Sequence, residues 1–208
     1  VYVSGVFTMN GRSAITYCTT DTGITGGTGG GVWVEETGTL TMNDISAIRI
    51  CTARTGGGVT VNSGSSYGQF FMNGGTITGC EATDDRSGGG GIFNSGKVTM
   101  TGGKITDCTN NFHSADPESG GVLNHGQFTM SDGTIGAGCT IFNIGSSRTV
   151  FTISGSAEIY ADITNCSTLH ADGGRVRGTV KNGYQNHNNP GTITGSGTGA
   201  TTFHSDVE

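Results

Sequence analysis

Charged and imidazole side chains gather in two short segments, residues 81–87 (EATDDRS) and residues 109–119 (TNNFHSADPES). Several carboxylates in one place could bind Ca²⁺, which takes about six to eight oxygen ligands. Two carboxyl groups roughly 5–10 Å apart could instead hydrolyse a glycosidic bond. A third interpretation is a solvated acidic loop edge without a ligand. The residues expected to bind a ligand or calcium are Asp84, Asp85, Arg86, His113, Asp116 and Glu118.

Cysteine recurs once in roughly every thirty residues, a spacing that indicates one cysteine per structural repeat. Stacked strands would bring neighbouring Cα atoms to about 4.8 Å, a separation that allows disulfides. The alternative is a column of buried thiols, because stacking need not produce the disulfide dihedral. We expect no zinc centre, since the chain lacks a CxxC pair and the cysteines fall along a line. The disulfides expected from neighbour pairing are Cys18–Cys51, Cys80–Cys108 and Cys139–Cys166.

Both groups of residues belong to an internal repeat. Residues 88–108 read GGGGIFNSGKVTMTGGKITDC and residues 120–139 read GGVLNHGQFTMSDGTIGAGC. A third clear copy spans residues 56–80, and weaker copies span 29–51, 4–18 and 140–166. The register is marked by the cysteines and by a second column of residues. That column is Met9, Met42, Met72, Met100, Met130 and Ile153.

Each repeat contains three short strand-like runs, which in one copy are residues 91–94, 97–101 and 104–106. Gly-containing pairs separate them and allow tight corners. Three strands per turn and a period near thirty predict an all-β, right-handed, single-stranded parallel β-helix with about six rungs. We expect the rungs to occupy residues 1–166, and residues 167–208 to form an irregular terminal rung or cap.

Alternation within the repeats predicts which side chains face the interior. The inward columns are Phe7, Leu40, Phe70, Val98, Phe128 and Phe151, then the methionine column, and Ile15, Ile48, Ile77, Ile105 and Ile135. The outward column is Thr8, Thr41, Phe71, Thr99, Thr129 and Thr152. A corner column is expected from Asn62, Asn94, Asn124 and Asn143, whose side chains can hydrogen-bond from rung to rung.

The composition agrees with stacked small units and excludes some partners. Glycine supplies 40 of 208 residues, and only 32% of residues are hydrophobic. The formal net charge is −6 without a basic run, so we expect no nucleic-acid partner. No apolar stretch approaches the roughly 20 residues that span a bilayer. Because the chain begins at Val1 within a repeat, we expect a processed protein or part of a longer one.

The quoted units resemble the Gly-rich β-helix repeats of large bacterial surface proteins and adhesins, and more loosely those of chlamydial polymorphic outer-membrane proteins. The resemblance covers nearly all of residues 4–166. It implies a parallel β-helix, a location outside the cell and an adhesive or structural role. One departure is the cysteine at the rung end, where such repeats often carry asparagine.

Three functions follow as hypotheses. The first is a non-enzymatic extracellular β-helix segment of a surface protein, with a glycan or a host or matrix surface as its partner. It needs no cofactor beyond the Ca²⁺ considered above, and its ends could associate with those of other copies. The second is a carbohydrate-active β-helix enzyme, although no catalytic constellation is recognised. The third is an ice-binding solenoid, suggested by the outward threonines.

Overall fold

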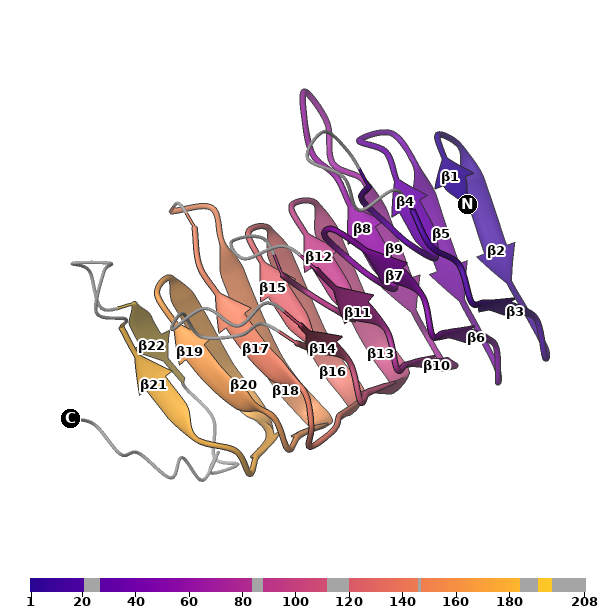
Figure 1. Ribbon diagram of the computed structural model, residues 1–208. Coiled ribbons are helices and arrows are strands. Elements are labelled where there is room, and N and C mark those ends of the chain that lie inside the picture. Colours follow the sequence, from indigo (N-terminus) through magenta and orange to yellow (C-terminus); the bar gives the residue numbers. More distant parts are fainter. Residues whose placement is uncertain (21–26, 84–87, 112–119, 146, 184–190, 196–208) are drawn as a thin grey trace.

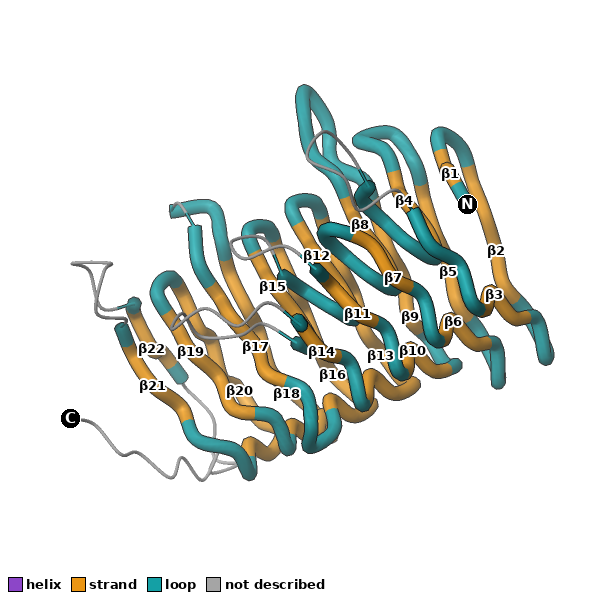
Figure 2. Tube along the Cα trace, in the orientation of Figure 1, coloured by secondary structure: helices purple, strands orange, loops and turns teal. Residues whose placement is uncertain are grey.

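The chain forms a parallel β-solenoid, in which successive turns of the backbone lie one above another (Figures 1 and 2). The computed structural model describes residues 1–20, 27–83, 88–111, 120–145, 147–183 and 191–195. These residues form strands, turns and loops and contain no helix. Accordingly, nothing in the described ranges could cross a membrane as a helix. The expected all-β parallel fold is confirmed.

Three sheets run along the solenoid, and all pairings between their strands are parallel. The first sheet has eight strands, in the order β1 (Tyr2–Val3), β4 (Val32–Val34), β8 (Val59–Val61), β12 (Ile92–Asn94), β15 (Val122–Asn124), β17 (Thr140–Asn143), β19 (Asp162–Asn165) and β21 (Val180–Asn182). Because sequence order and spatial order agree, each turn of the chain lies directly beside the turn before it.

The second sheet has eleven strands and carries most of the interior. Its main path is β2 (Val6–Met9), β5 (Thr39–Met42), β9 (Gln69–Met72), β13 (Lys97–Thr106), β16 (Gln127–Ile135), β18 (Val150–Ile159), β20 (Thr168–Val176) and β22 (Thr192–Thr194). Beside that path lie β3 (Ala14–Thr16), β6 (Ala47–Arg49) and β10 (Thr76–Thr78). The third sheet contains only β7 (Thr52–Ala53), β11 (Glu81–Ala82) and β14 (Thr109–Asn110).

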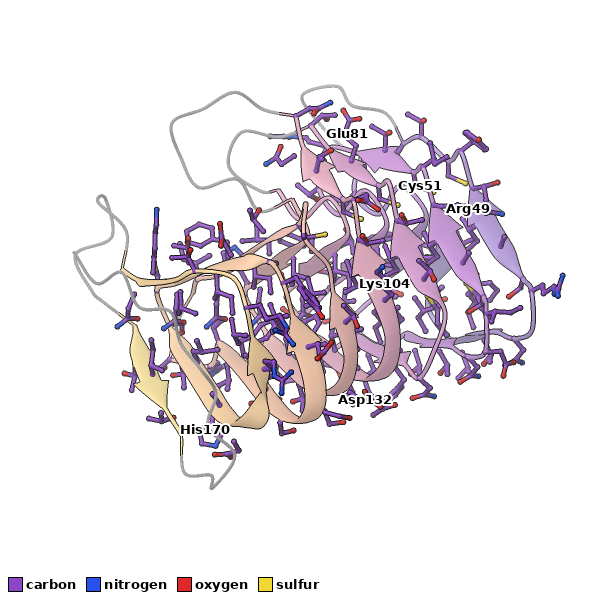
Figure 3. The ribbon with its side chains drawn as sticks, turned by 90° about the horizontal axis from the view of Figure 1, so that it is seen from below. Arg49, Cys51, Glu81, Lys104, Asp132 and His170 are labelled. Carbon is purple, nitrogen blue, oxygen red and sulfur yellow. The ribbon has the colours of Figure 1, made fainter. Side chains whose placement is uncertain are left out.

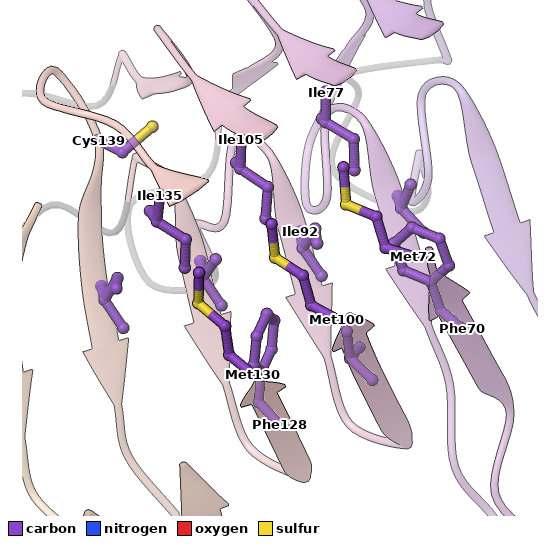
Figure 4. Packing of buried hydrophobic residues seen from close by; sticks show 14 of the residues in the cluster. Phe70, Met72, Ile77, Ile92, Met100, Ile105, Phe128, Met130, Ile135 and Cys139 are labelled. Atoms are coloured by element: carbon purple, nitrogen blue, oxygen red, sulfur yellow. The ribbon is translucent and has the colours of Figure 1, made fainter. Parts of the chain in front are cut away.

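The interior consists of in-register columns of identical or similar side chains, as the repeat predicts. Met72, Met100 and Met130 are paired across neighbouring strands and are fully buried (Figure 4). Phe128 and Phe151 stack with ring centroids 4.7 Å apart. Each rung is too thin to bury these side chains alone, so burial requires both neighbouring rungs.

The expected second and third runs of a rung become one continuous strand from the fourth rung onward. In β13 the chain passes through Gly102 and Gly103 without leaving the sheet, at the cost of two register shifts against β16. Gly103 has a φ of 83°, and a Cβ there would meet the Gly74 and Gly75 carbonyl oxygens at 2.8 Å. The glycines therefore bend this strand around a corner and do not interrupt it.

The stack has more than the six expected rungs and continues beyond residue 166. Strands β20, β21 and β22 lie beyond that position and pair in parallel with the preceding rungs. The late rungs are also shorter. Stacked corner asparagines are 30 residues apart between Asn94 and Asn124, but 19, 22 and 17 residues apart in the following steps.

The corner asparagines form a buried ladder, with one correction to the expected set. Val61, and not Asn62, is paired with Asn94. The ladder then runs through Asn124 and Asn143, with Nδ2 to Oδ1 distances of 2.7 and 2.8 Å. Asn94 Oδ1 is buried. Because the valine on the preceding rung offers no donor, this oxygen accepts no hydrogen bond from the described residues. At the far end the ladder extends through Asn165 to Asn182.

Candidate functional site

Five cysteines occupy one corner of the solenoid, and after Cys51, Cys80 and Cys108 the chain turns into the third sheet. The backbone pairs in parallel immediately after each one, since Glu81 N donates to Cys51 O and Thr109 N donates to Cys80 O, both at 2.9 Å. The thiols turn inward and donate to backbone carbonyls, as Cys108 Sγ does to Thr106 O at 3.3 Å. The sulfurs are not bonded to one another in this structure.

A glycine faces each of four cysteines, Cys51, Cys80, Cys108 and Cys139, and this close approach explains why a small side chain is required there. A Cβ on Gly91 would lie 3.3 Å from Cys108 Sγ, and one on Gly58 would lie 3.4 Å from Cys80 Sγ. The same Gly91 Cβ would come within 2.7 Å of a neighbouring carbonyl oxygen. Cysteine thus fills a narrow part of the cross-section, where a larger side chain would displace the opposite strand.

Hydrogen bonds between the stacked thiols shift their pKa values in opposite directions. The pKa of Cys80 is lowered to about 4 by hydrogen bonds with Cys108 and Cys51, and the pKa of Cys139 is lowered by its hydrogen bond with Cys108. The pKa of Cys108 is raised, first by side-chain hydrogen bonds with Cys139 and Cys80 and then by burial. The pKa of Cys51 is raised by its hydrogen bond with Cys80 and by burial. The thiolate is the form of cysteine that acts as a nucleophile and as a metal ligand. Because their pKa is raised, Cys51 and Cys108 are poor nucleophiles and poor metal ligands. The described residues also contain no cluster of three metal-ligating side chains.

Cys166 departs from the expected column. It follows Asn165, which is paired with Asn143 and Asn182, so it lies at the asparagine corner and not beside Cys139. The expected Cys139–Cys166 pairing therefore joins two different corners of the solenoid. Burial raises the pKa of Cys166, although its side chain is only partly buried.

The acidic loop edge lies mostly outside the described residues. Asp84, Asp85, Arg86, His113, Asp116 and Glu118, which were expected to bind a ligand or calcium, all fall in the ranges that the structure does not describe. Of the neighbouring residues, Glu81 begins β11 and accepts a hydrogen bond from Asn111 Nδ2 at 2.7 Å. Glu81 is therefore engaged in a contact between adjacent rungs.

A shallow groove of about 480 Å³ lies on another face, along the outward side of the isoleucine column. Alternation places it there, because the residues on either side of each buried isoleucine point outward. Lys104 is one of these outward residues (Figure 3). The lining residues are Lys104, Thr106, Thr134, Gly136, Ala137, Glu158 and Tyr160.

One end of the groove is a network around Glu158. The Tyr160 hydroxyl donates to Glu158 Oε2 at 2.9 Å. Two guanidinium groups approach Glu158 Oε1, with Arg175 at 4.0 Å and Arg177 at 3.9 Å. The Arg177 guanidinium also lies 5.4 Å from the centroid of the Tyr160 ring, a cation–π distance. These contacts fix the tyrosine ring at the groove while leaving Tyr160 39% exposed.

A second polar cluster lies near the last rungs. His170 Nε2 contacts Asp172, and His170 Nδ1 is 2.8 Å from Thr194 Oγ1. The order carboxylate, imidazole, hydroxyl resembles a catalytic relay. However, His170 and Thr194 are paired neighbours in the second sheet, in the same outward column as Thr152. The cluster is thus a continuation of the outward column.

Sequence reasoning located the buried isoleucines but not the groove beside them. The signal was present in the short runs Lys104-Ile105-Thr106, Glu158-Ile159-Tyr160 and Arg175-Val176-Arg177, whose outer members must share one face. No family model, curated protein or solved structure matches the chain.

Proposed function

We propose that the chain is a non-enzymatic, extracellular β-helix segment of a surface protein, with an adhesive or structural role. The observation that carries this proposal is the stacked frame, whose outward columns are not needed for packing. Two of these columns form a groove that is lined by an exposed tyrosine and a lysine. A rigid frame that presents such side chains suits binding to an extended surface, because little conformational entropy is lost on binding.

The partner in this proposal is a glycan or a host or matrix surface. Saccharides bind through aromatic rings and through dense hydrogen bonding, and the outward faces offer both. The threonine column includes Thr8, Thr41 and Thr129, which are in register on the second sheet. A net charge of −6 does not favour a polyanionic nucleic acid.

Binding of the purified chain to immobilised glycans and matrix proteins tests the proposal. We expect saturable binding to at least one class of glycan or matrix protein. A variant with alanine at Asp84, Asp85, Asp116 and Glu118 separates the loop edge from the rest of the surface, since only loop-dependent binding should be lost. Absence of binding to every immobilised partner would contradict the adhesive role.

A carbohydrate-active enzyme is the second candidate, and Glu158 is the observation that favours it. This carboxylate lies in the groove next to a tyrosine hydroxyl and two guanidinium groups. Glycoside hydrolysis usually needs two carboxyl groups across the scissile bond, and Glu158 is the single carboxylate among the described lining residues. New reducing ends or unsaturated products from a polysaccharide panel, lost in Glu158→Gln, would establish the enzyme in place of the adhesive segment.

A further inference from the structure

We propose that the groove along the isoleucine column binds an acidic saccharide, with a pyranose ring against Tyr160 and a uronate carboxylate near Lys104. This inference rests on the proposed adhesive function and assigns it a site and a ligand class. It uses residues that lie in, or directly after, the paired strands β13, β16, β18 and β20.

The shape of the groove comes from one missing side chain. Thr106, Gly136 and Tyr160 occupy the same outward position on three successive rungs, because Gly136 N donates to Ile105 O and Tyr160 N donates to Ile135 O, both at 2.8 Å. Thr106 and Tyr160 have side chains there and Gly136 has none. The tyrosine ring therefore borders an open space about one rung wide, with Ala137 beside it.

The ring of Tyr160 is held in a position that suits stacking. Its hydroxyl is tied to Glu158, and Arg177 lies over the ring. Tyr160 lines the groove, and 39% of the residue remains exposed. Such a preorganised aromatic ring loses little freedom when an apolar sugar face packs against it.

Lys104 is the group of the groove that would bind an anionic ligand. Glu158 is already shared between Arg175 and Arg177, whereas Lys104 makes no ion pair with a described residue. The nearby carboxylates have other partners: Asp107 accepts from the Thr106 hydroxyl at 3.0 Å, and Asp162 accepts from Thr179 N at 2.7 Å. A carboxylate on the ligand would therefore pair with Lys104, the one cation among the described lining residues.

Threonine hydroxyls complete the lining. Thr134 is paired with Lys104 on one side and with Glu158 on the other, and it lines the groove between them. A hydroxyl both donates and accepts, which matches the hydroxyl groups of a sugar. The lining thus offers a ring platform, a cation and neutral hydrogen-bonding groups within three rungs.

Calorimetric titration with a galacturonic acid oligomer, compared with a neutral galactose oligomer of equal length, tests the assignment. We expect the acidic oligomer to bind more tightly and its affinity to fall with added salt. Tyr160→Ala and Lys104→Gln should each weaken its binding by about tenfold or more. Arg49→Gln is the matched control, because Arg49 is exposed in the same outward column as Tyr160 but does not line the groove.

The outcomes separate this inference from the function on which it rests. Equal affinity for both oligomers, or equal weakening by Arg49→Gln, would overturn the groove assignment. The same holds if Tyr160→Ala and Lys104→Gln, shown to be folded by circular dichroism, bind as the unchanged chain does. If the unchanged chain attaches to glycans or matrix but not to the acidic oligomer, the adhesive proposal survives without this site. If it attaches to nothing, both fail.

Discussion

Among single residues, the buried asparagines should contribute most to stability per side chain. Asn124 is fully buried, accepts from Asn94 and donates to Asn143. Replacing it by alanine leaves Asn143 Oδ1 without this donor and removes one of the two acceptors of Asn94 Nδ2. We expect Asn124→Ala to lower the free energy of unfolding by roughly 2–4 kcal/mol, since each unsatisfied buried group costs about 1–3 kcal/mol. Urea denaturation measures this change.

A second asparagine ladder on the surface supplies the control. Asn73 Nδ2 donates to Asn43 Oδ1 at 2.9 Å, and its Oδ1 accepts from Thr101, but these contacts are exposed to water. Water can replace the lost partners, so we expect Asn73→Ala to cost less than about 1 kcal/mol. Equal losses in the two variants would show that burial does not determine the contribution of the ladders.

The cysteines allow a direct test of the two interpretations of their column. Cys51, Cys80 and Cys108 are fully buried, whereas Cys18 and Cys166 are partly exposed. In a purified chain with free thiols, a thiol reagent should modify the two partly exposed cysteines first. The four buried cysteines should react only after unfolding, so that all six are then modified. Fewer than six reactive thiols in denaturant without reductant would instead indicate disulfides between neighbouring rungs.

At the scale of the strands, the corner between the first and third sheets should tolerate almost no added volume. A Cβ on Gly91 would press on the carbonyl of Gly121, on Ile105 and on Cys108 at once. We expect Gly91→Ala to destabilise the fold by about 1–3 kcal/mol, the usual cost of overpacking. Gly5→Ala is the control, because nothing lies within 4 Å of its added Cβ. Thermal unfolding followed by circular dichroism compares the two.

The strands also show what could be predicted from the sequence and what could not. The methionine, phenylalanine and isoleucine columns were predicted correctly, because alternation and a repeated residue type fix both face and register. The position of Cys166 was predicted wrongly. A constant period near thirty places it below Cys139, but the rungs there are only 19 and 22 residues long. Loop length can change from rung to rung without affecting the stacked strands.

The groove could not be predicted from the repeat for a related reason. A repeat describes what successive rungs share, and the groove arises where they differ. Gly136 stands between Thr106 and Tyr160 in one outward column, and Glu158 stands between Thr134 and Arg175 in the next. Packing does not constrain these outward positions, so they are free to carry binding residues while the inward columns remain constant.

For the whole molecule, stability should behave as a sum over neighbouring rungs, because each rung contacts only the one before and the one after. Deleting residues 99–128 joins Val98 to Thr129 and removes one complete rung, since Val98 and Phe128 occupy the same column. Every inward residue then keeps its face. We expect a folded chain with a smaller free energy of unfolding and a smaller m-value, in proportion to the surface lost.

Deleting residues 99–127 instead is the matched control, because it leaves one extra residue in the strand. Val98 is then followed by Phe128, and Met130 and the residues after it are shifted to the opposite face. The burial of the methionine and phenylalanine columns depends on both neighbours, so this shift should abolish cooperative unfolding, although the chain is longer by one residue. If urea denaturation gave similar cooperative transitions for the two deletions, the inward columns would not determine how the rungs align.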